Sequence, residues 1–405
     1  MPRADPATPP PVVRPRAGVY VFHMEPETRF PEIGTSIFTV MSELARSSGA
    51  VNLGQGFPDF EPPAALVAGT VRAMAQGHHQ YAPMHGIQPL REAIAGKIEA
   101  CHGVKVCPDT EITVTSGASE GILDAVLAVV RPGEEVILLD PAYDAYAPAV
   151  LLAGGRAVHV PLDPQDFRVD WERLEAALSP HTRLLVLNTP HNPSGAVWTA
   201  GEMARLDALL RDTGTLVLSD EVYEHMVFDG AAHESALRTP GLARRSFVLS
   251  SFGKTYHCTG WKVGYCVAPA ALTREFRKIH QCNTFSTFTP AQWALAEMIR
   301  EHPEHHEALG PFLQARRDRF AAGLASTPFR PLPVAGAYFQ LVDYSAISDL
   351  PDLEFARWLC TERGVATIPL SPFYADPPPD QRLVRLCFAK DDETLEAGLA
   401  RLREA

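Results

Sequence analysis

The sequence contains very little lysine. Six lysines stand against 30 arginines in a chain of 405 residues. We interpret this bias as compositional, and it singles out the lysines that remain, which are Lys97, Lys105, Lys254, Lys262, Lys278 and Lys390. The chain also lacks an apolar run of about 18 residues, the length of a membrane-spanning helix, and its start shows no apolar stretch typical of a secretory leader. These absences predict a protein that is neither inserted in a membrane nor exported.

The sequence also lacks the motifs of several common protein classes. Its seven cysteines form no Cys-x-x-Cys pair, which favours reduced thiols in a cytoplasmic protein over disulfides or a zinc site. No Gly-x-Ser-x-Gly or Walker sequence occurs, so neither a hydrolase triad nor a nucleotide phosphate loop is indicated. Five histidines lie among polar residues, which favours a solvated surface over a metal site, and they are His78, His79, His302, His305 and His306. A net charge of -12 argues against a nucleic acid or an anionic membrane as partner.

Short apolar runs alternate with helical patterns through the middle of the chain. The runs are Val136–Leu139, Leu184–Leu187, Leu216–Leu218, Phe247–Leu249 and Gly264–Val267. Because such continuous apolar strands are typical of a sheet covered on both faces, we predict an α/β fold with a mostly parallel central sheet and a smaller α+β domain. The predicted parts are a Pro-rich tail (1–28), an arm with part of the small domain (29–65), a large domain (66–303) and a C-terminal small domain (304–405).

Polar residues gather where the predicted strands end. Ligands of an open α/β sheet bind beyond the carboxyl ends of its strands. The segments at these ends supply hydroxyl, phenol, amide, carboxylate and amine groups, and they are Ser116–Ser119, Asp140–Tyr143, Asn188–Gly195, Ser219–Tyr223 and Ser250–Lys254. Packing alone does not explain this set, so we predict a ligand site at this edge of the sheet.

Lys254 is the most informative single residue. It follows a buried strand in a glycine-containing loop, and its amine can form a Schiff base with a carbonyl cofactor, although an exposed structural lysine fits the same position. Lys262, eight residues later, could bind a phosphate as a point charge. The segment around Ser119 could bind an anion or simply cap a helix. Asp220 could pair with a cationic ring nitrogen or serve a turn, and Tyr143 could stack on a ligand ring or belong to the core.

Several of these segments together resemble one known family. Asn188-Thr-Pro-His-Asn-Pro-Ser-Gly195, Ser219-Asp-Glu-Val-Tyr223, and Ser251-Phe-Gly-Lys254 with Gly260-Trp-Lys262 are similar to the pyridoxal-phosphate-dependent class I aminotransferases of fold type I. Longer stretches are similar to the branch of bacterial methionine and kynurenine–glutamine transaminases, namely Ile33–Phe38, Asn52–Phe60, Gln80–Pro83, Ser251–His257 and Arg385–Lys390. The similarity runs from about residue 30 to the end of the chain.

The resemblance implies a role for each matching residue. Catalytic roles fall on Lys254, Asp220 and Tyr143, and substrate binding on Gly56, Asn192 and Arg385. Binding of pyridoxal 5'-phosphate is implied for Ala118, Ser119, Tyr143, Asn192, Asp220, Tyr223, Ser251, Lys254 and Lys262, and for Tyr81 from the partner subunit. The implied assembly is therefore a homodimer with its active site at the subunit interface, and no metal is expected.

Physical chemistry supports three of these roles. Asp220 would keep the cofactor ring nitrogen protonated, so that the ring can accept electrons from the substrate Cα. Lys254 would act as general base and acid at that carbon. The planar guanidinium of Arg385 would hold the substrate carboxylate through two parallel hydrogen bonds, which orients the molecule better than a lysine would.

The expected reaction is ping-pong transfer of an amino group from methionine, or a similar large apolar or aromatic L-amino acid, to a 2-oxo acid. The residues Ile37, Phe38, Phe57 and Tyr81 suggest an apolar side-chain pocket. An alternative is a kynurenine or glutamine transaminase with cysteine-conjugate β-lyase activity. A non-enzymatic alternative, the effector domain of a transcription regulator, requires a fused DNA-binding segment, and the short tail leaves no room for one.

Overall fold

A computed structural model describes residues 28–405. The predicted Pro-rich tail at 1–28 therefore lies almost entirely outside the described residues. The chain divides into the units Met1–Thr35 and Ser36–Ala405, and residues 28–35 of the first contain no helix or strand. Within the described residues no helix has the length and apolarity needed to cross a membrane. All seven cysteines fall in this range, and none forms a disulfide.

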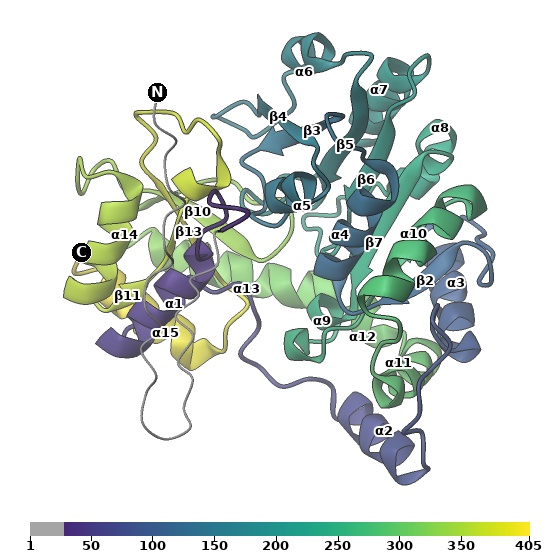
Figure 1. The fold of residues 1–405 in the computed structure, drawn as a ribbon. Coiled ribbons are helices and arrows are strands. Elements are labelled where there is room, and N and C mark those ends of the chain that lie inside the picture. The colour runs from purple at the N-terminus through teal and green to yellow at the C-terminus, as the bar shows by residue number, and fades with distance from the viewer. Residues whose placement is uncertain (1–27) are drawn as a thin grey trace, which may run out of the picture. The chain divides into compact units, whose positions relative to one another are not determined.

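The second unit is built on a seven-stranded sheet with the order β2-β8-β7-β6-β5-β3-β4 (Figure 1). Strand β8 runs in the direction opposite to the other six strands, which are parallel to one another. The inner strands are buried along their length and apolar in the middle, as in β3 and β7, because helices cover both faces of the sheet. The strands are β2 (Ile112–Thr115), β3 (Glu135–Asp140), β4 (Arg156–Pro161), β5 (Thr182–Asn188), β6 (Leu216–Asp220), β7 (Ser246–Ser251) and β8 (Gly264–Val267). The predicted α/β class with a mostly parallel sheet is confirmed.

Helices fill the connections between these strands. Helix α4 packs against β7 and β8, α10 packs on α4, and α2 and α3 pack on α11. The α-helices up to α11 are α1 (Ile37–Ser48), α2 (Ala64–Ala75), α3 (Gln88–His102), α4 (Ala118–Val129), α5 (Tyr146–Leu152), α6 (Trp171–Ala177), α7 (Ala200–Leu210), α8 (Pro240–Ala243), α9 (Phe252–Thr255), α10 (Ala270–Asn283) and α11 (Thr289–Glu301). Two 3-10 turns lie among them, η1 (Ala236–Arg238) and η2 (Thr259–Trp261).

A smaller sheet region combines segments from both ends of the second unit. Strand β1 (Val51–Asn52) pairs in parallel with β11 (Val365–Ala366), and a separate antiparallel sheet has the order β12-β13-β10-β9. Figure 1 shows the purple α1 beside the later, yellow-green α14, which it contacts. The remaining elements are α12 (Glu304–Glu307), α13 (Leu309–Leu324), β9 (Arg330–Pro331), β10 (Phe339–Asp343), α14 (Asp352–Glu362), β12 (Ile368–Pro369), η3 (Ser371–Phe373), β13 (Leu383–Cys387) and α15 (Asp392–Leu402). The domain boundaries at 29–65, 66–303 and 304–405 stay predictions.

Two local features differ from what the sequence suggests. The apolar positions Ile37, Val40, Met41 and Leu44 predict a helix within the segment 33–45. Helix α1 begins only at Ile37, because the Ser36 hydroxyl caps it by accepting a hydrogen bond from the Phe38 N–H. Strand β4 was not predicted at all. It is an edge strand with only one fully buried residue, Val160, so it lacks the continuous apolar run of the inner strands.

Candidate active site

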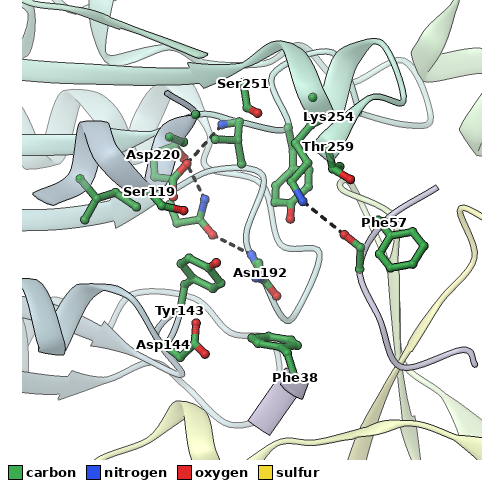
Figure 2. A pocket seen from close by; sticks show the side chains of 18 of the residues that line it. Phe38, Phe57, Ser119, Tyr143, Asp144, Asn192, Asp220, Ser251, Lys254 and Thr259 are labelled. Atoms are coloured by element: carbon green, nitrogen blue, oxygen red, sulfur yellow. Dashed lines mark hydrogen bonds between the residues drawn. The ribbon is translucent and has the colours of Figure 1, made fainter. Parts of the chain in front are cut away.

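A cavity of about 380 Å³ opens at the carboxyl edge of the central sheet (Figure 2). It collects eleven of the twelve residues named from the sequence, which are Gly56, Ala118, Ser119, Tyr143, Asn192, Asp220, Tyr223, Ser251, Lys254, Lys262 and Arg385. They come from strand ends, helix starts and the smaller sheet, so only the fold brings them together. Tyr81 does not line this cavity, and 82% of its surface is exposed.

Lys254 carries the amine of the site. The sequence places it in a loop, whereas the structure places it in the short helix α9 directly after β7. Its Nζ donates a hydrogen bond of 3.2 Å to the carbonyl oxygen of Gly56, as Figure 2 shows. Burial, together with the positive charges of Arg385 and Lys262, lowers the pKa of the amine to about 8. The amine can therefore lose its proton near neutral pH, as a nucleophile or a general base must.

Asp220 ends strand β6 and is buried at the bottom of the cavity. Its Oδ2 accepts a hydrogen bond of 2.6 Å from the Tyr146 hydroxyl, and its Oδ1 accepts one from the Val222 N–H. Burial raises the pKa of this carboxyl to about 6, and it forms no ion pair with a described residue. A buried carboxylate of this kind is stabilised by a cationic partner. The arrangement fits a ligand that presents a protonated nitrogen to Asp220.

The start of helix α4 forms an anion-binding corner of the cavity. Gly117 precedes the helix and contributes no capping side chain, so the first N–H groups of α4 stay free for a ligand. Gly117 has φ +80°, and a Cβ there would lie 3.1 Å from Nζ of Lys262. Lys262 itself adopts a left-handed backbone (φ 55°), uncommon for a residue with a side chain, and this conformation accompanies its placement beside the helix start. A phosphate would meet the N–H groups of α4 and a lysine cation here.

Arg385 is the largest fully buried side chain of the site. It lies on β13, where it donates from Nη1 to Asn192 Oδ1 (2.6 Å) and from Nη2 to the Gly54 carbonyl (3.0 Å). Its Nε is buried without a partner, and it forms no ion pair with a described residue. Its guanidinium lies 4.0 Å from the ring centroid of Phe339. A buried, unpaired guanidinium of this kind is suited to binding a carboxylate.

Aromatic rings line the rest of the cavity. Tyr143, Phe38 and Asp144 lie together on one side in Figure 2, and the rings of Tyr143 and Phe38 are 6.3 Å apart. Phe38 and Phe57 line the cavity as the sequence predicts, whereas Ile37 does not and instead packs against the hydrophobic core.

The sequence reasoning missed several lining residues, namely Asp144, Tyr146, Thr259 and Phe339. For two of them a signal was available. Tyr146 and Asp144 stand next to the motif that ends in Tyr143, and a buried Asp220 requires a hydrogen-bond donor. No local pattern marks Phe339, which reaches the cavity from β10 of the smaller sheet.

The fold and this site together define an α/β enzyme with a buried amine, and comparison with known proteins gives its family. The family model "Aminotransferase class I and II" matches residues 48–402. The chain therefore belongs to the class I and II aminotransferases, pyridoxal-phosphate-dependent transferases that act on amino acids and 2-oxo acids.

Several relatives align with most of the chain. The methionine aminotransferase of Escherichia coli is 52% identical, with 94% of this chain and 98% of the relative covered. A probable N-succinyldiaminopimelate aminotransferase of Mycobacterium tuberculosis is 41% identical, covering 93% and 97%. Kynurenine–oxoglutarate transaminase 1 of the mouse is 34% identical, covering 89% and 93%. The solved structure of E. coli YbdL, described with a methionine aminotransferase function, has a TM-score of 0.92 at 52% identity and covers 94% of this chain and all of that one.

Proposed function

We propose that this chain forms a cytoplasmic homodimer that transfers the amino group of methionine, or of a similar large apolar or aromatic L-amino acid, to a 2-oxo acid in a ping-pong cycle. The observation that carries the proposal is the buried, unpaired guanidinium of Arg385 in the same cavity as the amine of Lys254. The cavity is also lined by Phe38, Phe57 and Phe339, which suit an apolar substrate side chain. The 52% identity with a methionine aminotransferase supports this substrate class.

We assign the residues of the cavity to pyridoxal 5'-phosphate as follows. The free N–H groups of Ala118 and Ser119, the Ser251 hydroxyl and the Lys262 cation would bind its phosphate, with Tyr81 of a second copy reaching the same group. Asp220 would bind the ring nitrogen, and Tyr143 would stack on the ring. Asn192 and Tyr223 would bind the ring hydroxyl. When bound, the cofactor supplies an electron-accepting ring conjugated to the substrate Cα.

The protein's own groups then orient the substrate and move one proton. Arg385, with Asn192 and the backbone of Gly56, would hold the α-carboxylate and so fix the direction of the Cα–H bond. The amine of Lys254, whose pKa is lowered to about 8, would take the proton from the substrate Cα. It would then give the proton to the cofactor carbon that is joined to the transferred nitrogen.

A spectroscopic experiment tests the proposed function. We expect the purified protein to be yellow from lysine-bound cofactor and to lose this absorbance when L-methionine is added without an acceptor, because the first half-reaction then stops at the aminated cofactor. Stopped-flow absorbance over a series of amino donors measures kcat/KM for each. A colourless protein that takes up no pyridoxal phosphate, or one that stays yellow with every donor, contradicts the proposal.

The donor series also separates the alternatives. Methionine and phenylalanine represent the proposed class, and kynurenine, glutamine and N-succinyldiaminopimelate represent the other relatives. A cysteine S-conjugate, assayed for pyruvate and thiol, reports β-lyase chemistry. We expect methionine to exceed N-succinyldiaminopimelate and alanine in kcat/KM; the reverse order reassigns the substrate class while leaving the transaminase chemistry in place.

The proposed homodimer is based on exposed apolar residues of α2 and on exposed aromatic residues that include Tyr81. Val67, Val71 and Met74 follow one another on the same face of α2, and 40%, 61% and 45% of their surfaces are exposed. Tyr81 and Phe285 are also exposed, with ring centroids 5.4 Å apart. We infer that a second copy covers this face, because the resemblance requires Tyr81 to enter the partner's cavity and Tyr81 does not line its own.

Replacing Val71 with glutamate tests this assembly. A charge in the centre of an apolar contact costs several kcal/mol, so we expect the variant to sediment as a monomer and to lose most of its transaminase activity. The matched control is Leu350→Glu, which places the same charge at another exposed apolar residue. A Val71→Glu variant that stays dimeric and active, like the control, means that this face of α2 is not the interface.

A further inference from the structure

A short loop of the smaller region forms one wall of the cavity. We call residues Gly54–Phe57 the substrate loop. It follows β1, and its residues Gln55, Gly56 and Phe57 line the cavity. The loop packs closely, since a Cβ at Gly56 would lie 2.8 Å from the ring of Phe339. Its shape therefore decides how far Gly56 and Phe57 reach toward a substrate.

Three of the four backbone carbonyls of the substrate loop accept hydrogen bonds from side chains outside it. The donors are Arg385 to Gly54 (3.0 Å), Tyr338 and Lys254 to Gly56 (2.8 and 3.2 Å) and Lys390 to Phe57 (2.8 Å). Arg385, Tyr338 and Lys254 lie in or next to the cavity. Lys390 does not itself line the cavity and is the donor whose role the transamination reaction leaves unexplained.

Lys390 is buried in an unusual way for a lysine. Only 3% of its surface is exposed, and it forms no ion pair with a described residue. Its Nζ also lies 4.4 Å from the ring centroid of Phe57, so the ammonium holds both the carbonyl and the ring of the same residue. Burying a cation without a carboxylate is costly. A lysine kept here, in a chain that otherwise strongly favours arginine, indicates a requirement beyond packing.

Phe57 separates two cavities. On one side it lines the active site, and on the other it lines a second cavity of about 420 Å³ together with Asp59, Lys390 and Asp391. The loop is therefore not backed by close packing on its outer side. Without a fixed contact, Phe57 could turn its ring away from the active site into the second cavity, because room for it exists there.

We propose that Lys390 is a positioning residue that keeps Phe57 in the wall of the substrate side-chain subsite and so sets the preference for large apolar amino donors over small ones. The inference rests on the proposed function, since it concerns the substrate side chain. Phe57 held inward contacts a long side chain such as that of methionine. The methyl group of alanine does not reach this wall, so discrimination between the two donors depends on where Phe57 lies.

The test compares methionine with alanine in Lys390→Met, a replacement of similar length without the charge. We expect the ratio of their kcat/KM values to fall about tenfold, through a higher KM for methionine, with little change for alanine. Lys390→Gln keeps a hydrogen-bond donor and should give an intermediate ratio. The control is Lys278→Met, because Lys278 is exposed on α10 and pairs with Glu275 rather than with the substrate loop. All rates are divided by the concentration of bound cofactor, so that incomplete cofactor occupancy of a variant does not lower its measured rate.

A double-mutant cycle identifies the route of the effect. If Lys390 acts through Phe57, then Phe57→Ala lowers the ratio by itself and adding Lys390→Met lowers it no further. Variants of Lys390 that lose thermal stability but keep the wild-type ratio overturn the proposal, because the lysine is then only structural. Additive effects of the two replacements overturn it as well. A wild-type enzyme that does not use methionine refutes the proposed function instead. The ratio of kcat/KM values in the cycle is then measured with the large amino donor that the enzyme uses best.

Discussion

Replacing Lys254 with alanine is expected to lower transaminase activity by at least about 10⁴-fold, the upper end of the effect of a positioned acid–base group. The amine is buried, its pKa is lowered to about 8, and it lies 3.2 Å from the carbonyl oxygen of Gly56 in the cavity. None of the other five lysines donates a hydrogen bond to Gly56. Single-turnover absorbance with methionine measures the loss, and the absorbance maximum should shift because the proposed bond between the cofactor and Lys254 cannot form.

Two further variants make this result specific. Lys254→Arg should be as inactive as Lys254→Ala, because a guanidinium stays protonated and cannot take a proton from carbon. Lys278→Ala, at an exposed lysine paired with Glu275, should keep wild-type activity. A Lys254→Arg variant with substantial activity contradicts the assignment of this residue as the base.

The second large effect is expected on stability, from Lys97. Its Nζ lies 2.7 Å from both Glu224 Oε1 and the Tyr265 hydroxyl, with only 3% and 4% of the Lys97 and Glu224 side chains exposed. Burial alone would raise the pKa of Glu224, but Lys97, His225 and His102 together outweigh it and hold that pKa well below its ordinary value. We expect Lys97→Met to lower the free energy of unfolding by about 3–5 kcal/mol, because it leaves a buried carboxylate without its cation. Urea unfolding at equal cofactor loading measures the change.

The pH dependence of this difference follows from both partners. Glu224, with a lowered pKa, contributes stability above its ordinary value of 4.5 and loses it as the pH falls through the folded-state pKa. Lys97, with a raised pKa, contributes below 10.5 and loses it as the pH rises through the folded-state pKa. The difference between wild type and Lys97→Met should thus be constant between pH 6.5 and 10.5. Below pH 6.5 it should shrink, because His225, whose pKa Lys97 helps to lower, can become charged beside Glu224 once the lysine is gone. Adding Glu224→Gln should recover part of the loss; an unchanged double variant would contradict an electrostatic origin.

The inner strands and the central motifs could be predicted because both are local in the sequence. A strand covered on two faces must be apolar along its length, so β3, β5, β6, β7 and β8 are visible as short runs. The motifs containing Asn192, Asp220 and Lys254 directly follow three of these strands, and parallel strands place their carboxyl ends at one edge. The class of fold and most of the cavity follow from these two facts.

Elements that depend on distant contacts could not be predicted in the same way. Strand β4 is half-exposed at the edge of the sheet, so its sequence shows no continuous apolar run. Its backbone hydrogen bonds with β3 define it as a strand, and these are visible only in the structure. Phe38 and Phe339 reach the cavity from segments about 300 residues apart in the sequence. Ile37, adjacent to Phe38, faces the core instead, because helical geometry turns neighbouring residues about 100° apart.

The few lysines show which properties of this protein the sequence determines and which depend on the tertiary structure. The sequence by itself determined the family, the α/β class and the amine at Lys254, since these depend on residue types at short spacing. Only the tertiary structure decided that Lys97 and Lys390 are buried while Lys278 is exposed, and that the unpaired Arg385 shares a cavity with Lys254. The physical reason is that burial, and with it the pKa and the partner of each charge, depends on which distant segments surround a side chain.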